Sequence, residues 1–163
     1  MLPKLVQDMF VRVKNNGENL AVKVETPDLI HSTHEIVDML TLLCKKEEMP
    51  VLYVVRPDRL TEYVWDKGDW GQPQENPLEK SLETVEKSRN QFALFIFWDI
   101  SQRLDDRDGH PSVRCFIPQF FLSPRATRKF LVFIEPLGTQ YPSIVTPYIT
   151  SLTEHYPSKE ELL

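Results

Sequence analysis

The stretch Phe92-Ala-Leu-Phe-Ile-Phe-Trp-Asp99 decides the fold class of this chain. An unbroken apolar run of this length, rich in aromatic and branched side chains, is typical of a strand that is buried on both faces inside a parallel sheet. Similar runs at residues 20–25, 51–55 and 129–134, and a weaker one at 146–152, predict further strands. Their largely continuous apolar character favours a sheet that helices cover on both sides.

Amphipathic segments lie between these strands, as parallel connections require. Apolar residues recur at helical spacing in four segments: 3–14, 32–47, 77–88 and 112–122, the last of which contains Pro118. A polar loop is predicted at 104–111 and a terminal helical turn at 159–163. The sequence therefore predicts a single α/β domain over residues 1–163. We expect a three-layer, mostly parallel sheet of four to five strands with helices on both faces, preceded by an N-terminal helix.

Local signals predict where two of these helices begin. Ser32 and Glu35 have the spacing of a capping box, in which each side chain accepts a hydrogen bond from the backbone amide of the other residue. Asn76 is expected to cap the next helix, with Pro77 in its first turn and Glu79 reaching back to the cap. Each pattern stands where a loop ends and an amphipathic segment begins, so each predicts the first residue of a helix.

The composition argues against several classes of function. Hydrophobic residues make up 41% and charged residues 26% of the 163 residues, which is ordinary for a globular protein. The formal net charge of −5 argues against a nucleic-acid partner, because a polyanion needs a basic face and the only basic cluster is at 125–129. No apolar run approaches the roughly 18 residues of a membrane span. We therefore expect no membrane association, a cytoplasmic location, and free thiols at Cys44 and Cys115.

Asp99 stands directly after the buried strand, as does the acid on the strand that holds metal and water in P-loop NTPases. Such enzymes also need a loop of the form G-x-x-x-x-G-K-[ST], whose amides and lysine bind the phosphates. The chain contains no such loop, and its first strand leads instead into Glu25-Thr-Pro-Asp28. The acids of this turn repel a triphosphate, and its proline lacks an amide donor. We expect no catalytic residues, no cofactor or cofactor-binding residues, and no enzymatic activity.

Acidic side chains at the strand ends leave a second interpretation open. In an open α/β sheet, ligands bind beyond the carboxyl ends of the strands, where this chain has Glu25, Asp28, Asp99 and Glu135. Glu25, Asp28 and Asp99 are candidate ligands of a Mg²⁺ ion, which favours a few carboxylates and water. The simpler interpretation of Asp99 is that it caps the turn that follows it.

Residues 56–74 are punctuated by glycine and proline and are predicted to be irregular. They contain Tyr63, Trp65 and Trp70 among acidic residues. Aromatic side chains in a polar loop are typical anchors of protein interfaces, so these three residues are the candidates for binding a partner. The other interpretation is a loop that folds its tryptophans onto the sheet.

Several short motifs resemble those of one family, over nearly the whole chain. They are Val22-Lys-Val-Glu-Thr-Pro-Asp28, Pro50-Val-Leu-Tyr53, Val64-Trp-Asp66 with Gly68, Asn76-Pro-Leu-Glu79 and Ala93-Leu-Phe-Ile-Phe-Trp-Asp99. The family is the AAA+ ATPase-like proteins of cyanobacteria, algal plastids and some phages, in whose non-catalytic amino-terminal domain similar motifs recur in this order. The resemblance implies a degenerate P-loop NTPase-like fold that serves the assembly or regulation of an ATPase. The AAA+ module with its Walker motifs is missing, so no ATPase residue can be carried over.

Taken together, these patterns predict a non-enzymatic protein-interaction or regulatory domain. The expected partner is a protein, either an AAA+ ATPase or a second copy of the chain, bound through the aromatic segment or the end of the sheet. The alternative is a switch domain that binds Mg²⁺ or a nucleotide in the acidic pocket at the strand ends. A third hypothesis is a phage-type inhibitor or assembly factor that has reused the same fold.

Overall fold

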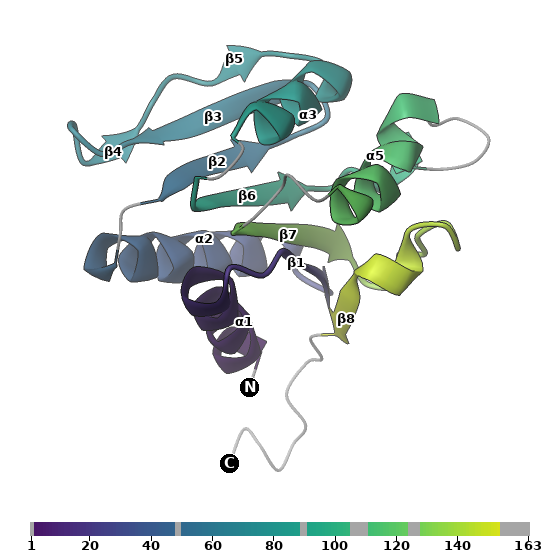
Figure 1. The fold of residues 1–163 in the computed structure, drawn as a ribbon, viewed down its shortest axis with the longest axis horizontal. Helices are drawn as coiled ribbons and strands as arrows, with labels where there is room; N and C mark the ends of the chain where they lie inside the picture. Colours follow the sequence, from purple (N-terminus) through teal and green to yellow (C-terminus); the bar gives the residue numbers. More distant parts are fainter. Residues whose placement is uncertain (1, 48–49, 89–90, 105–110, 124–127, 154–163) are drawn as a thin grey trace.

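The computed structural model describes residues 2–47, 50–88, 91–104, 111–123 and 128–153 (Figure 1). The helices are α1 (Leu2–Asn16), α2 (Leu29–Lys46), α3 (Leu78–Lys87), α4 (Ser101–Leu104) and α5 (Pro111–Leu122), with a 3-10 turn η1 (Thr146–Tyr148). The strands are β1 (Leu20–Thr26), β2 (Val51–Val55), β3 (Arg59–Val64), β4 (Asp69–Trp70), β5 (Gln74–Glu75), β6 (Ala93–Trp98), β7 (Lys129–Pro136) and β8 (Thr150–Thr153).

The strands form one mixed sheet in the order β4-β3-β2-β6-β7-β1-β8, with β5 paired to β3. The five strands β2, β6, β7, β1 and β8 are parallel to their neighbours, whereas β3 runs antiparallel to β2, β4 and β5. The predicted α/β class with a largely parallel centre is confirmed, but the sheet is larger than the four to five strands predicted. The additional strands β3, β4 and β5 lie in and just beyond residues 56–74, so the prediction that this segment is irregular is wrong.

Helices cover both faces of the sheet and enclose two apolar clusters (Figure 1). One cluster lies under α1 and α2 and includes Val6, Phe10, Leu40, Cys44 and the even-numbered residues 130, 132 and 134 of β7. The other lies under α3, α4 and α5 and includes Leu82, Leu104, Phe116, Phe120 and the odd-numbered residues 131 and 133 of the same strand. Alternate residues of one strand therefore pack against the helices on opposite faces of the sheet. This is why the central strands are apolar throughout.

Strand β6 occupies the middle of the sheet between β2 and β7, as its apolar run predicts. All of its residues are buried except Trp98, which is half-buried. Phe95 stacks on Tyr53 of β2 with 5.4 Å between ring centroids, and Phe97 stacks on Phe133 of β7 at 4.6 Å. These aromatic pairs join three neighbouring strands on the face covered by α3 and α5.

Two helices begin differently from the prediction. Asp28, not Ser32, is the N-cap of α2, because its carboxylate accepts a hydrogen bond from the amide of His31 at 3.1 Å. The helix therefore starts at Leu29, and Ser32 lies buried inside its first turn. Pro77 is the N-cap of α3, without a side-chain capping bond, and the Asn76 amide donates to Ser81 Oγ at 3.1 Å. In both cases the residue that matches a capping pattern is used for another contact.

Other predicted elements are shifted or fall outside the description. Helix α5 continues through Pro118, which is buried. The weak strand predicted at 146–152 is instead η1 followed by β8. Cys44 and Cys115 are free, as predicted; Cys44 is buried and Cys115 half-buried. Most of the polar loop predicted at 104–111, and the terminal helical turn predicted at 159–163, lie outside the described residues.

Candidate functional site at the β1–β7 switch point

The chain changes its direction of travel across the sheet at the neighbouring strands β1 and β7. From β1 it passes through α2, on one face, to β2, and it returns through β6 to β7 by way of α3, α4 and α5 on the opposite face (Figure 1). The connections that leave β1 and β7 therefore diverge to opposite faces. In open α/β sheets such a switch point, at the carboxyl ends of the strands, is where ligands bind.

The turn between β1 and α2 is closed by its own polar groups. Thr26 Oγ1 accepts a hydrogen bond from the amide of Asp28 at 3.1 Å and lies 2.7 Å from Ser32 Oγ. The Asp28 carboxylate caps the first turn of α2 through His31. A helix N-terminus attracts anions through its free amides, and here a built-in carboxylate already takes that position.

The segment that follows β7 folds back over the end of β1. The amide of Leu137 donates to the carbonyl oxygen of Thr26 at 2.9 Å, and the amide of Gly138 donates to Glu25 Oε1 at 2.9 Å. Gly138 has a φ of +85°, a conformation that favours glycine and that turns its amide toward the strand. Residues 136–141, which we call the plug segment, thus lie across the carboxyl end of β1.

A buried lysine of β1 contacts the plug segment. Lys23 is only 6% exposed, and its Nζ donates to the carbonyl oxygen of Thr139 at 2.9 Å. The same ammonium lies 3.4 Å from Glu25 Oε2 and 4.9 Å from the centroid of the Tyr141 ring. Three partners thus compensate the desolvation of this charge, and two of them, Thr139 and Tyr141, belong to the plug segment.

Glu135, the last buried residue of β7, has no exposed surface. Its Oε2 accepts hydrogen bonds from the hydroxyl of Tyr141 at 2.5 Å and from the amide of Ile100 at 3.3 Å, and its Oε1 has no partner among the described residues. Burial, together with the nearby Asp99 carboxylate, raises the pKa of Glu135 to about 7. Burial and the charge of Glu135 also raise the pKa of Tyr141 well above its usual range. The pair therefore holds a proton that an exposed glutamate would have released.

Of the candidate metal ligands, the structure brings Glu25 and Asp99 to the switch point, while Asp28 is used to cap α2. Asp99 has a φ of +52°, and its amide donates to the carbonyl oxygen of Ile134 at 3.0 Å, which fixes the turn out of β6. Among the described residues, no group of three or more His, Cys, Asp or Glu side chains has the arrangement of a metal site. The carboxylates of Glu25, Asp28 and Glu135 are thus bound by amides, a lysine and a tyrosine of the same chain.

The sequence identifies Glu135 as a strand-end acid, but it did not reveal that Tyr141 donates to Glu135 or that the buried Lys23 contacts Glu25 and the plug segment. A lysine inside an otherwise apolar strand was the available signal for Lys23, because such a charge is buried only when it has partners. For Tyr141 no local signal exists, since its position depends on the path of the plug segment.

The aromatic residues proposed to bind a partner form a small cluster on the hairpin of β3 and β4. The Tyr63 ring is 4% exposed and lies 4.5 Å from the Trp65 ring and 5.1 Å from the Trp70 ring. The Trp65 indole donates to the carbonyl oxygen of Pro50 at 2.9 Å. Tyr63 therefore packs on the sheet, and the half-buried Trp65 and Trp70 keep part of their surface available.

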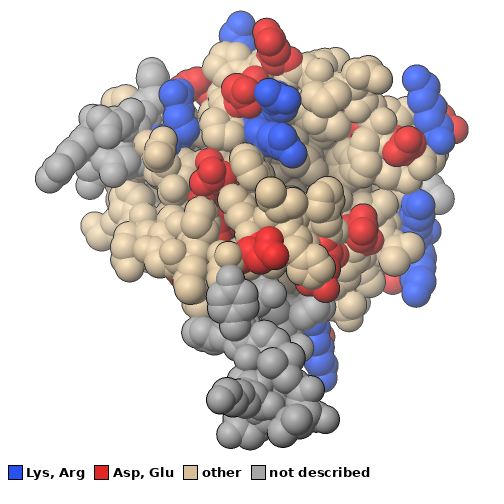
Figure 2. Space-filling model, turned by 180° about the vertical axis from the view of Figure 1, so that it is seen from behind, with Lys and Arg blue, Asp and Glu red and all other residues tan. Residues whose placement is uncertain are grey.

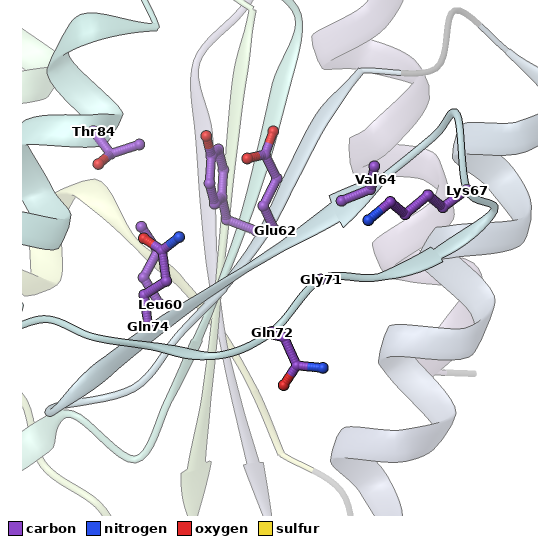
Figure 3. Close-up of a pocket in the computed structure, with 9 residues that line it drawn as sticks. Leu60, Glu62, Val64, Lys67, Gly71, Gln72, Gln74 and Thr84 are labelled. Atoms are coloured by element: carbon purple, nitrogen blue, oxygen red, sulfur yellow. The ribbon is translucent and has the colours of Figure 1, made fainter.

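The rest of the described surface has two features of note. On the face seen in Figure 2, acidic and basic side chains are interspersed, some of them side by side, and the basic side chains do not gather into one patch. A pocket of about 440 Å³ lies between β3, the β4–β5 segment and α3. Figure 3 shows Glu62, Lys67 and Thr84 among the residues that line it. Burial and the Glu62 carboxylate raise the pKa of Tyr53, which also lines this pocket.

Comparisons of the chain with protein-family models, with curated proteins and with solved structures give no match. No helix in the described ranges has the length and apolar character needed to cross a bilayer.

Proposed function

We propose that this chain is a non-enzymatic protein-interaction or regulatory domain, related to the amino-terminal domain of AAA+ ATPase-like proteins. The observation that carries the proposal is that polar groups at the switch point are hydrogen-bonded to residues of the same chain. The turn after β1 is closed by Thr26, Asp28 and Ser32, and the plug segment is hydrogen-bonded across the carboxyl end of β1. In an active α/β enzyme, groups at this position bind a ligand. In this protein they bind other residues of the same chain.

The order of the parallel strands supports the relationship to P-loop ATPases. Numbered by their order in the chain, the five parallel strands lie as second, third, fourth, first and fifth across the sheet. In ATPases of the AAA+ type the first strand, which leads into the phosphate loop, likewise lies between the fourth and the fifth. This support is at the level of the fold, which alone does not establish a function.

The electrostatics of the site support a domain without nucleotide chemistry. Phosphoryl transfer depends on amides, a lysine and a metal ion that surround the phosphates. Here the first turn offers the Asp28 carboxylate, and the nearby Lys23 already contacts Glu25 and Thr139. A phosphate at the N-terminus of α2 would have to displace the Asp28 carboxylate from the amide of His31.

Calorimetry with ADP, and with ATP and Mg²⁺, tests the proposal that the domain is non-enzymatic and does not bind nucleotides. We expect no heat of binding from either nucleotide. The alternative function, a Mg²⁺ or nucleotide switch at Glu25, Asp28 and Asp99, predicts saturable heat that Asp99→Asn abolishes. A nucleotide seated in the turn after β1 in a soaked crystal would refute the proposal.

The proposed interaction function requires a protein partner. Surface plasmon resonance against purified AAA+ ATPases from the same source is expected to show saturable binding, and sedimentation velocity tests a second copy as the partner. If the hairpin aromatics contribute, Trp70→Ala weakens binding, whereas Leu122→Ala, at a 71% exposed position on the opposite face, leaves it unchanged. Absence of binding to any such ATPase and of self-association would remove the interaction function.

A further inference from the structure

An open groove lies between α2 and the hairpin of β3 and β4, on the face of the sheet opposite α3. Its volume is about 360 Å³. We call it the α2–β3 groove, and the residues that line it include Val37, Asp38, Val54, Arg56, Arg59 and Trp70. All of them are exposed or half-buried, so the groove is a surface feature and not a closed cavity.

The middle of the groove is apolar. Val37 of α2, Val54 of β2 and the indole of Trp70 belong to the partly buried residues that pack against the core, and each keeps some accessible surface. Trp70 is held in place by its edge contact with the buried Tyr63 ring. A rigid, partly exposed tryptophan beside aliphatic side chains is suited to hold one apolar side chain of a partner.

One end of the groove carries two guanidinium groups. Arg56 follows β2, and its guanidinium carbon lies 4.9 Å from the centroid of the Trp98 ring, which orients the planar group. Arg59 is linked to this turn by the hydrogen bond from the Arg56 amide to its carbonyl oxygen at 2.9 Å. Both side chains are exposed, so they retain donors that can bind an incoming carboxylate.

The two arginines differ in how far they are already paired. Arg59 forms two contacts with Asp58, at 3.2 and 3.1 Å, and these lower the pKa of the Asp58 carboxyl. Arg56 has no carboxylate within ion-pair distance in the described part of the chain. The nearby acid that its charge affects is Asp58, which is already paired with Arg59. In a protein of net charge −5, an oriented arginine that forms no ion pair of its own can attract the carboxylate of an acidic partner.

The opposite wall of the groove favours one orientation of a bound partner. Asp38 of α2 is exposed and faces the same groove, so it disfavours acidic groups at that wall. The favourable position for a carboxylate is therefore at Arg56 and Arg59, with the apolar residue of the partner over Val37 and Trp70.

We propose that the α2–β3 groove binds an acidic peptide segment of a protein partner, with a carboxylate on Arg56 and a neighbouring apolar side chain against Trp70. The inference rests on the proposed interaction function and names the chemistry of the partner. A small anion would use the arginines alone, whereas a peptide also covers the apolar middle of the groove.

Fluorescence anisotropy with two labelled peptides tests this directly. The first peptide carries one leucine between two pairs of glutamates, and the second carries lysines in place of the glutamates. We expect the purified chain to bind the acidic peptide at least tenfold more tightly than the basic one. Equal binding of the two peptides, or no binding of the acidic peptide up to millimolar protein, would overturn the proposal.

Variants then locate the binding. Arg56→Glu is expected to reverse the preference between the two peptides, and Asp38→Asn to strengthen binding of the acidic one. Trp70→Ala should weaken binding at least fivefold. Lys80→Glu, at an exposed position of α3 on the other face, makes the same change in net charge as Arg56→Glu and should leave binding within twofold. An unchanged preference in a folded Arg56→Glu variant would also overturn the proposal.

The outcomes separate this inference from the proposed function. If an AAA+ ATPase binds the chain and Arg56→Glu does not affect that binding, the groove inference is wrong and the interaction function stands. If the acidic peptide binds in an Arg56-dependent way and no ATPase or second copy does, the groove inference stands and the identity proposed for the partner is wrong.

Discussion

Glu135 illustrates how burial sets the protonation state of a single residue. Its carboxyl is surrounded by the sheet, by α4 and by Tyr141, and only one of its two oxygens has a partner in the described structure. The charged form has lost its hydration, and the hydrogen bonds from Tyr141 and from the amide of Ile100 do not replace it. Protonation of Glu135 therefore stabilises the fold.

The stability of the protein should fall as the pH rises from about 4.5 to 7. The folded-state pKa of Glu135 is about 7 and its ordinary value is 4.5, so the folded state binds the proton more tightly in this window. The contribution is complete below pH 4.5 and is lost by the time the pH has passed 7; it amounts to roughly 3 kcal/mol. Urea denaturation across this range measures it.

Glu135→Gln provides the matched comparison, because an amide keeps an acceptor oxygen for Tyr141 and does not titrate. The difference in free energy of unfolding between the two proteins should change with pH over this window and be constant above it. An equal pH dependence in both proteins would show that Glu135 is not the titrating group.

At the scale of single elements, the turn from β1 into α2 depends on one capping residue. Removal of the carboxylate in Asp28→Ala leaves the amide of His31 without its acceptor. We expect a loss of about 1 kcal/mol in the free energy of unfolding, measured by thermal or chemical denaturation. Asp38→Ala removes the same charge from an exposed position farther along α2 and should change stability by less than half as much. Equal losses would mean that Asp28 acts only through net charge.

The hairpin of β3 and β4 depends on the backbone of Gly68. This residue has a φ of +68°, and a Cβ built there would meet no atom within 4 Å. Gly68→Ala should therefore destabilise the protein by about 1 kcal/mol through backbone conformation alone. Gly68→Asn, which tolerates this conformation better, should cost less in the same denaturation experiment. A larger loss for Asn than for Ala would contradict this explanation.

The elements that the sequence predicts well are those with a long, uniform pattern. The bounds predicted for the buried run of β6 and for the amphipathic α1 lie close to those observed, and for α2 the predicted end is close although its start is three residues too late. The hairpin was missed because β4 and β5 have two residues each and β3 is half exposed, so neither length nor alternation identifies them. The capping box at Ser32 failed because Asp28, four residues earlier, competes for the same helix start.

The candidate site was only partly predictable for a related reason. The acids at the strand ends can be read directly from the sequence once the strands are placed. Their partners cannot: Lys23 meets Thr139 across 116 positions of the chain, and that contact depends on the strand order of the whole sheet. Strand order follows from the sum of many long-range contacts, and no single motif encodes it.

At the scale of the whole molecule, stability should decrease from the centre of the sheet toward the β3–β5 edge. Strands β6 and β7 are buried and paired on both sides, whereas β3 is largely exposed and its partners β4 and β5 are short. Hydrogen exchange measured by NMR should give the slowest amides in β6 and β7 and faster exchange in β3. Equal protection of β3 and β6 would indicate one cooperative unit that includes the hairpin.

The position of β1 inside the sheet also has a consequence for synthesis on the ribosome. Val22 is paired with Val132 of β7 on one side and with Thr150 of β8 on the other, so both neighbours of the first strand are made more than a hundred residues later. The apolar strand β1 stays unpaired until β7 and β8 have been synthesised. Its exposed apolar surface favours binding by a chaperone during translation. A nascent chain that stops before β7 cannot complete its sheet.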